Sequence, residues 1–228
     1  MAKEKETKET TEELAAADKI ALFIAKYRVI ILAVLAFTAA GVIGAAAFFT
    51  VRNELQKRAI VKLTALEKRL GDIGDPADET KTTEVQALAE EFNSLAGASF
   101  GYAAAKAYSL AAGIYAERKE WAKAEEAWKS SAEKGEAIYI APISLYNAAA
   151  AAEEQGKLDA ALDYFGRCLA FTGNNPAAPR ARFNMGRIYE TEGRTAEALE
   201  AYRALVENES PDSSWVKLAH SRIISLGG

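Results

Sequence analysis

Side chains that could carry acid–base or nucleophilic chemistry are few in this sequence, and their spacing keeps them apart. Adjacent carboxylates include Glu90 and Glu91, Glu125 and Glu126, and Glu153 and Glu154. General acid–base catalysis takes two carboxyl groups that converge on one cleft. Because neighbours on a helix point about 100° apart, we interpret these pairs as solvated helix faces.

The other candidates for chemistry are one cysteine, Cys168, and one histidine, His220. They are too few for a zinc site. Cys168 stands beside Phe165 and Leu169, where we expect a small buried hydrophobe. No glycine-rich phosphate loop precedes a predicted helix. We therefore expect no catalytic residue, cofactor or metal, and we predict that the protein is not an enzyme.

The composition favours a folded, all-α chain. Of the 228 residues, 50% are hydrophobic and 26% are charged, which is enough apolar material for a packed core. The 28 Lys and Arg against 32 Asp and Glu give a net charge of −4, without the basic excess of a nucleic-acid-binding surface. Only 5 Pro and 15 Gly interrupt a sequence rich in strong helix formers.

An uncharged run of 23 residues, from Val29 to Val51, predicts a transmembrane helix near the start. As a helix it is about 34 Å long, enough for a bilayer core of about 30 Å. A cleaved signal peptide is the alternative, because Ala45-Ala46-Ala47 offers a small-x-small site. The preceding charged region and the apolar run are both longer than in a signal peptide, so an uncleaved signal anchor fits better.

Basic residues flank this span almost equally. In the 15 residues before the span there are three, Lys19, Lys26 and Arg28, and in the 15 from Val51 onward there are four, Arg52, Lys57, Arg58 and Lys62. The positive-inside rule is close to a tie, and we favour a cytoplasmic N-terminus because long domains translocate largely regardless of charge. Inside the span, a small-residue stripe on one helix face predicts a contact with another membrane helix, although such spacing also arises by chance. The stripe consists of Ala36, Ala40 and Gly44.

The segment before the span is polar and charged. Residues 1–18 have too little apolar surface to offset the entropy of ordering, so we expect a flexible tail. Ile20 to Ala25 is apolar, and either lies on the membrane surface or extends the transmembrane helix.

After the membrane segment the sequence matches itself at a shift of 37 residues. Small residues occupy two columns of the three copies, at Ala112, Ala149 and Gly186 and at Ala124, Ala161 and Ala198. Four residues after the second column come aromatics, at Trp128, Phe165 and Tyr202. The turn inside each copy holds Lys119, Gly156 or Gly193. A helix hairpin of this kind cannot bury its apolar face alone, so we expect the three copies to stack.

Each column has a packing role. Small residues let two helices cross closely, the aromatics fill the space between neighbouring copies, and glycine accepts left-handed backbone angles in the turn. The spacing of small residue, aromatic, Gly, Ala, aromatic and Pro resembles the tetratricopeptide repeat family, whose usual period is about 34 residues. The resemblance implies a right-handed α-solenoid. The extra residues of each copy are expected in loops, at 134–136 and 173–175.

Helices are also predicted on both sides of the repeats. Arg52 to Leu70 and Thr83 to Ala96 read as two helices with a break at Gly71 to Pro76, and Ser213 or Ser214 can cap a last helix. The predicted division of the chain is a charged cytoplasmic tail at 1–28, the transmembrane helix at 29–51, a helical neck with a degenerate repeat at 52–104, three repeats at 105–212 and a capping helix at 213–228.

This order of tail, uncleaved span, helical neck and C-terminal repeats resembles the bacterial ancillary subunit of the Sec translocon. The resemblance implies a single-pass protein of the bacterial inner membrane, with a cytoplasmic N-terminus and periplasmic repeats. It also implies partners among translocon components, secretory chains and membrane-bound folding factors, besides the lipid bilayer.

In such repeats the first helix of each hairpin lines the concave face, and we predict that it forms a groove for a protein partner. The predicted partner-binding residues are Tyr146, Asn147, Arg180, Phe183, Asn184 and Arg187. A mixture of aromatic and amide side chains suits an extended or helical peptide, although some of these residues can simply solvate the surface. Tyr146 and Phe183 belong to none of the columns of small or aromatic residues. We therefore expect that neither of them holds the hairpins together.

Two other functions stay open. A cytosol-facing chaperone receptor would grip a C-terminal carboxylate with a basic and Asn clamp. Asn147 and Arg180 fit that clamp, whereas Ser109, Gly113 and Asn184 depart from it. The other alternative is a self-assembling or scaffold subunit, a homo-oligomer whose repeats stack on copies of themselves and whose membrane contact is the small-residue stripe.

Overall fold

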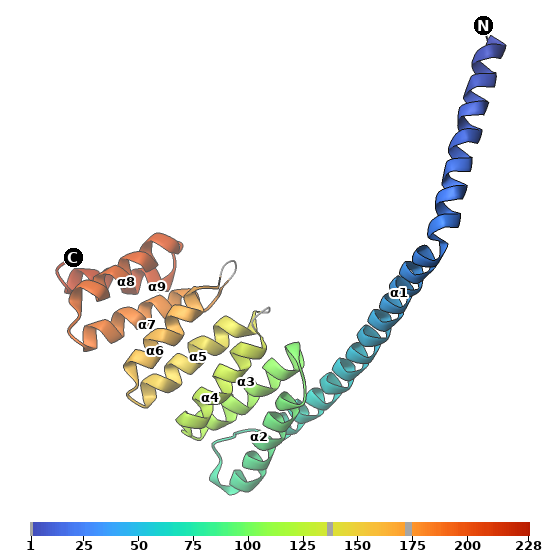
Figure 1. Cartoon of the computed structure of the whole chain (residues 1–228). Coiled ribbons are helices and arrows are strands. Elements are labelled where there is room, and N and C mark those ends of the chain that lie inside the picture. The colour runs from blue at the N-terminus through green and yellow to red at the C-terminus, as the bar shows by residue number, and fades with distance from the viewer. Residues whose placement is uncertain (1, 136–138, 172–174) are drawn as a thin grey trace. The chain divides into compact units, whose positions relative to one another are not determined.

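The computed structural model describes residues 2–135, 139–171 and 175–228, and within these ranges the chain forms helices and no strand (Figure 1). The elements are α1 (Ala2–Ile73), the 3₁₀ helix η1 (Glu79–Lys81), α2 (Thr82–Gly97), α3 (Gly101–Glu117), α4 (Trp121–Lys134), α5 (Ile140–Glu154), α6 (Leu158–Leu169), α7 (Ala178–Thr191), α8 (Thr195–Asn208) and α9 (Ser214–Ser225). The all-α prediction is confirmed. The loops predicted at 134–136 and 173–175 fall partly outside the described residues.

The chain divides into two compact units, residues 1–54 and 55–228. The first unit is a stretch of α1 whose apolar side chains are exposed, as at Val29 (72% exposed) and Phe37 (81% exposed). By length and composition the helix can cross a membrane, and no residue of its apolar window is buried. A long apolar surface left open in this way is what a hydrocarbon environment covers.

The charged N-terminal residues differ from the prediction. We expected residues 1–18 to be a flexible tail, but α1 is helical from Ala2 onward. The segment is rich in Glu, Lys and Ala, which lose little side-chain freedom in a helix. The apolar helix that follows supplies the nucleus that an isolated polar helix lacks. Ile20 to Ala25 is likewise part of α1, so it extends the apolar helix.

The second unit is a stack of helix hairpins. α3 packs on α4, α5 on α6, α7 on α8, and α9 on α8, while α4 contacts α5 and α6 contacts α7 (Figure 1). Their apolar faces form three clusters of buried side chains, and the largest fully buried side chains in them are Phe92, Phe165 and Tyr202. Leu63 of α1 belongs to the first cluster, so the end of α1 packs on the repeats. This arrangement is the predicted solenoid.

Both small-residue columns lie where helices cross. All six of their residues are buried, and the five alanines have no exposed surface. Phe165 and Tyr202 of the aromatic column are fully buried, and Trp128 lies half-buried against the first two clusters. The predicted alignment of the three copies is therefore confirmed.

Gly186 shows why its column takes small residues. A Cβ atom placed there would lie 2.5 Å from Cε1 of Tyr202, whose ring is fully buried. α7 and α8 thus approach so closely that even a methyl group would collide with the ring.

The turns inside the hairpins are three copies of one structure. Lys119, Gly156 and Gly193 all have positive φ, at 59°, 73° and 73°. The next residue donates its N–H five residues back, with N···O distances of 2.8 Å at Glu120, 2.9 Å at Lys157 and 2.8 Å at Arg194. This is the Schellman arrangement, which ends a helix on a left-handed residue. Lys119 therefore takes the backbone conformation that glycine takes in the other two copies.

A buried pair of serines joins the first two hairpins. Ser131 of α4 donates its hydroxyl to the carbonyl of Ala105 at 2.7 Å, and the Ser131 and Ser144 hydroxyls are hydrogen-bonded to each other at 2.8 Å. Both serines are almost fully buried. Since a buried hydroxyl is costly without a partner, Ser144 of the second hairpin depends on Ser131 of the first.

The flanking helices agree with the sequence. α1 continues to Ile73 and ends before Gly74, which has a φ of 81°, and α2 follows close to its predicted position. Ser213 caps α9, because its Oγ accepts a hydrogen bond from the Trp215 N–H at 3.3 Å.

Candidate protein-binding surface

The six predicted partner-binding residues come from two helices. Tyr146 and Asn147 lie on α5, and the other four lie on α7. Arg180 is exposed and the remaining five are half-buried, so each of them reaches the surface.

Three of these residues form one cluster, which we call the Arg180–Tyr146–Asn184 cluster. The Arg180 guanidinium lies 4.7 Å from the centre of the Tyr146 ring, and Asn184 Nδ2 donates to the Tyr146 hydroxyl at 3.1 Å. Tyr146 also packs on Phe165 of α6, with ring centres 5.6 Å apart. A stacked guanidinium keeps N–H donors at its rim. The cluster therefore presents an aromatic and cationic surface at the junction of the second and third hairpins.

Arg187 is engaged with a carboxylate. Its Nη2 lies 2.6 Å and 2.7 Å from the two carboxylate oxygens of Glu153, while 43% of the Arg187 side chain stays exposed. One repeat later, Arg222 of α9 pairs with Glu190, and its Nε donates to Glu190 Oε1 at 3.1 Å. Glu153 and Glu190 are 37 residues apart. In both copies, a glutamate at the same position of the repeat thus pairs with an arginine two helices further along the chain.

Phe183 differs from the prediction. Its ring centre lies 5.4 Å from that of Tyr202 and 5.5 Å from that of Trp215, within the third buried cluster. The expectation that Phe183 does not hold the hairpins together is wrong, because it joins α8 and α9. Tyr146 likewise packs against the second cluster. Both rings have a structural role, whatever they bind.

Sequence reasoning missed a polar cluster between the first two hairpins. Glu125 Oε2 accepts hydrogen bonds from Lys157 Nζ and Gln155 Nε2, both at 2.9 Å, and Glu125 Oε1 accepts one from the Tyr164 hydroxyl at 3.2 Å. Our interpretation of the glutamate pairs as solvated is therefore wrong for Glu125 and, through Arg187, for Glu153. The pairing residues lie 30 to 39 positions away, beyond what helical spacing reveals.

This cluster shifts two pKa values. Burial acts to raise the pKa of the Glu125 carboxyl, but the hydrogen bonds from Lys157 and Gln155 outweigh it and hold that pKa below its usual value. Burial and the neighbouring Glu125 charge raise the pKa of the Tyr164 hydroxyl to about 12. Glu125 is thus ionised and Tyr164 neutral over a wide range of pH.

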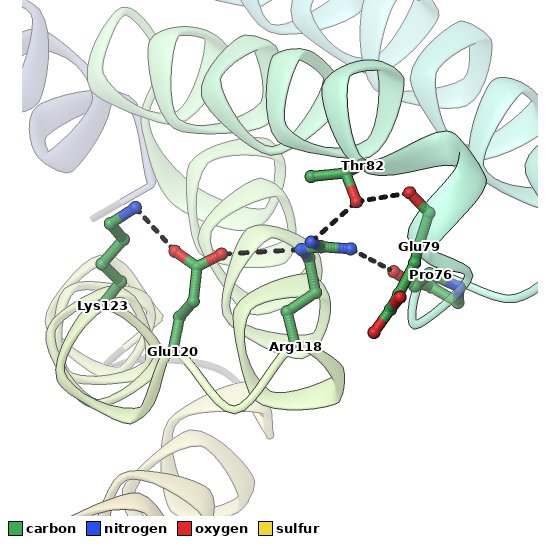
Figure 2. Close-up of polar contacts among 6 residues, drawn as sticks. All are labelled: Pro76, Glu79, Thr82, Arg118, Glu120 and Lys123. Atoms are coloured by element: carbon green, nitrogen blue, oxygen red, sulfur yellow. Dashed lines mark hydrogen bonds and ion pairs between the residues drawn. The ribbon is translucent and has the colours of Figure 1, made fainter.

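Arg118 fixes the segment before α2 to the first hairpin (Figure 2). Its Nη1 donates to the Pro76 carbonyl at 3.3 Å, its Nη2 donates to Thr82 Oγ1 at 3.0 Å, and its Nε lies 3.6 Å from Glu120 Oε1. Lys123 Nζ donates to the other Glu120 oxygen at 2.6 Å. Figure 2 shows the guanidinium between the carboxylate and the η1 segment. Arg118 therefore has a structural role.

An open groove of about 510 Å³ lies on α2, α3 and α4, away from the predicted residues. It is lined by Asn93, Tyr108, Tyr115, Lys123 and Glu126, among others. Asn93 Nδ2 donates to the Tyr115 hydroxyl at 2.9 Å. Two of the side chains that line this groove are thus hydrogen-bonded to each other.

The structure agrees with the expected role of Cys168. The side chain is fully buried, and burial raises the pKa of its thiol. A protonated, buried thiol is inert as a nucleophile. Among the residues that the structure describes, no group of three or more His, Cys, Asp or Glu side chains is placed to hold a metal ion.

The small-residue stripe of Ala36, Ala40 and Gly44 lies in the first unit and is exposed. A Cβ atom added at Gly44 would meet nothing within 4 Å. The stripe is therefore open to a helix partner, and its role stays a prediction.

Comparisons with known proteins agree with the repeat pattern. Residues 140–208 match the family model of the tetratricopeptide repeat. A "TPR repeat-containing protein" of Treponema pallidum (strain Nichols) is 39% identical over 130 residues, which cover 56% of this chain and 54% of that protein. The chain thus spans about half the length of this curated relative.

A solved structure also shows some likeness. It is described as a kinesin light chain of Podosopora anserina with nearly identical TPR-like repeats, at 13% identity and a TM-score of 0.48, covering 64% of this chain and 79% of that one. A likeness of this degree supports no argument about function. The family model and the relative agree with the hairpin stack, and residues 140–208 therefore have the pattern of tetratricopeptide repeats.

Proposed function

We propose that this chain is a membrane-anchored module that binds a protein partner across α5 and α7. The observation that carries the proposal is the Arg180–Tyr146–Asn184 cluster. Aromatic and Arg side chains dominate the binding energy of protein interfaces. Here an exposed guanidinium is held over a half-buried ring, so less side-chain freedom is lost when a partner arrives.

We further propose that the partner belongs to protein secretion. The order of an apolar helix, a helical neck and hairpin repeats supports a single-pass protein of the bacterial inner membrane, with its repeats in the periplasm. In this arrangement the repeats bind translocon components, secretory chains or membrane-bound folding factors. Protease protection on intact spheroplasts tests the topology: cleavage of the repeats from outside is expected, and full protection would favour the cytosol-facing receptor.

Site-specific photo-crosslinking in cells tests the surface. A photoreactive residue replaces Asn147, which follows Tyr146 on α5, and in a matched strain it replaces Arg203, which is exposed on α8. We expect crosslinks to translocon components or secretory chains from position 147 and not from position 203.

A charge reversal sharpens the test. Arg180→Glu is expected to remove the crosslinks from position 147, because an interface anchor is typically worth about 2 kcal/mol or more. Arg203→Glu reverses the same charge on α8 and is expected to leave them in place. Equal crosslinking from both positions, or crosslinks that survive Arg180→Glu, would place the partner elsewhere.

A further inference from the structure

The open groove on α2, α3 and α4 has an aromatic floor. Tyr108 and Tyr115 line it, and both belong to α3. They are seven residues apart, which is about two helical turns, so they lie on one face of that helix. Tyr108 is half-buried and packs against the first buried cluster, while Tyr115 is 7% exposed. Pockets that hold ligands measure about 300–1,000 Å³, so a groove of about 510 Å³ has room for side chains of a partner.

One tyrosine of this floor already holds a cation. Lys123 Nζ lies 5.3 Å from the centre of the Tyr115 ring, whose negative face attracts it. Glu120 fixes the same ammonium group, with 2.6 Å between Lys123 Nζ and Glu120 Oε2 (Figure 2). Among the residues that the structure describes, no cation lies over the ring of Tyr108. The groove therefore offers a second ring to a cation from another molecule.

Carboxylates stand on both sides of the groove. Glu126 of α4 lines it, and 71% of its side chain is exposed, with Lys129 at 3.9 Å. On α2, Glu90 lies one turn before Asn93, which lines the groove, and it forms no ion pair with any other described residue. Burial raises the pKa of the Tyr115 hydroxyl, and the charge of Glu90 raises it further. The Glu90 carboxylate thus acts on the floor of the groove.

The end of α2 adds to this negative potential. The helix ends at Gly97, and a Cβ atom placed there would lie 3.8 Å from the hydroxyl oxygen of Tyr108. The C-terminal end of a helix carries a partial negative charge of about half an elementary charge. Tyr108 therefore lies beside a helix end that favours cations.

We propose that this groove binds a basic segment of a protein partner, with a Lys or Arg side chain over the Tyr108 ring and facing the carboxylate of Glu126. An acidic segment would meet like charge from α2 and from α4. The site is separate from the Arg180–Tyr146–Asn184 cluster, which lies on α5 and α7 and presents a cation of its own. The two surfaces thereby select segments of opposite charge.

The test uses the full chain in micelles of an uncharged detergent. The probe is a dye-labelled peptide with two arginines, Gly-Ser-Leu-Arg-Ala-Leu-Arg-Ser-Gly, and its matched probe carries citrulline in place of both, which removes the charge and keeps the shape. Fluorescence anisotropy measures the two dissociation constants. We expect the arginine probe to bind about tenfold more tightly, because it alone gains the cation–π contact and the charge pair. Its binding is expected to weaken as salt is raised.

Two variants locate the binding. Tyr108→Leu removes the ring and keeps an apolar side chain, and Glu126→Gln removes the exposed charge. Each is expected to weaken binding of the arginine probe about threefold. The matched controls are Tyr139→Leu, at a tyrosine that is 65% exposed and does not line the groove, and Glu200→Gln, at an exposed acid on α8. Both controls are expected to bind the probe as wild type does.

Equal binding of the two probes by wild type would overturn the proposal, and so would binding that Tyr108→Leu and Glu126→Gln leave unchanged. An equal loss in Glu126→Gln and Glu200→Gln would show that the probe follows only the net charge of the chain, which would also refute the site. Circular dichroism checks that the variants fold. Because Glu126 is exposed, its variant keeps the test decisive even if Tyr108→Leu disturbs the first hairpin.

Discussion

Lys119 carries a side chain at a backbone position where its two counterparts are glycine. Its φ of 59° lies in the left-handed region, like the φ of Gly156 and Gly193. For a residue with a Cβ atom this region costs about 1–2 kcal/mol. The Schellman turn is nevertheless complete in all three copies, so the backbone hydrogen bonds of the turn hold the exposed Lys119 in a conformation that its own sterics disfavour.

Two substitutions at equivalent turns should therefore act in opposite directions. Lys119→Gly is expected to raise the free energy of unfolding by up to about 1 kcal/mol, because the relief of strain exceeds the added freedom of the unfolded chain. Gly156→Ala is expected to lower it by about 1 kcal/mol or more. Urea unfolding of the full chain in detergent, followed by circular dichroism, measures both. Equal signs would mean that the turns are not equivalent.

The contact between α7 and α8 depends on the absence of one methyl group. The Tyr202 ring fills the space in front of Gly186 and leaves no room for a Cβ atom. This ring belongs to the third buried cluster, against which Phe183 and Trp215 also pack. The third hairpin and α9 thus share a single aromatic centre.

Gly186→Ala is expected to destabilise the protein by about 1–3 kcal/mol through overpacking. Gly166 supplies the control, because it also lies inside a helix and is exposed, and a Cβ atom added there would meet nothing within 4 Å. Gly166→Ala is expected to stabilise by up to about 1 kcal/mol through helix propensity. Thermal melts that show the same direction for both alanines would contradict the close packing.

The helices and their crossings could be predicted because each leaves a periodic trace in the sequence. The roles of Ala161 and Gly156 could be predicted because the same residue type recurs 37 residues away. The contacts of Glu125 and Phe183 leave no such trace, because their partners are set by how hairpins stack. The same holds for the Arg180–Tyr146–Asn184 cluster: the sequence predicted its members as surface residues, while their mutual contacts required the structure.

Across the stack, neighbouring hairpins are joined by hydrogen-bonded ions as well as by apolar packing. Glu125 joins α4 to Lys157 and Tyr164, and Glu153 joins α5 to Arg187. In a solenoid, stability is approximately a sum over repeats and their interfaces. A change of charge at one such interface should therefore weaken the whole stack.

The lowered pKa of Glu125 predicts a loss of stability at acidic pH. Its folded-state pKa is lowered, so its stabilisation is present above the unfolded value of about 4.5 and is lost as pH falls through the folded value. We expect the free energy of unfolding to drop more between about pH 6 and about pH 3 in wild type than in Glu125→Gln. Urea titrations of the full chain at these pH values make the comparison, and parallel losses would show that Glu125 is not linked to folding.

The raised pKa of Tyr164 predicts a loss of stability at alkaline pH. Its pKa of about 12 lies above the ordinary value of 10.0, so its stabilisation is complete below pH 10 and is lost as pH rises toward 12. Wild type is expected to lose more stability than Tyr164→Phe as pH rises from about 10 to about 11. Ultraviolet absorbance of tyrosinate provides the independent readout, and ionisation of Tyr164 at the ordinary value would rule out the effect.

The buried serines have a consequence for the order of the repeats. One repeat after Ser131 and Ser144 the chain has Cys168 and Ala181, both in the second buried cluster. The first junction is thus closed by hydroxyl groups and the second by apolar ones, although the hairpins share one shape. If the second hairpin were moved away from the first, the Ser144 hydroxyl would be buried without its hydrogen-bond partner. The side chains buried between the hairpins thereby favour one order of the repeats over an exchanged order.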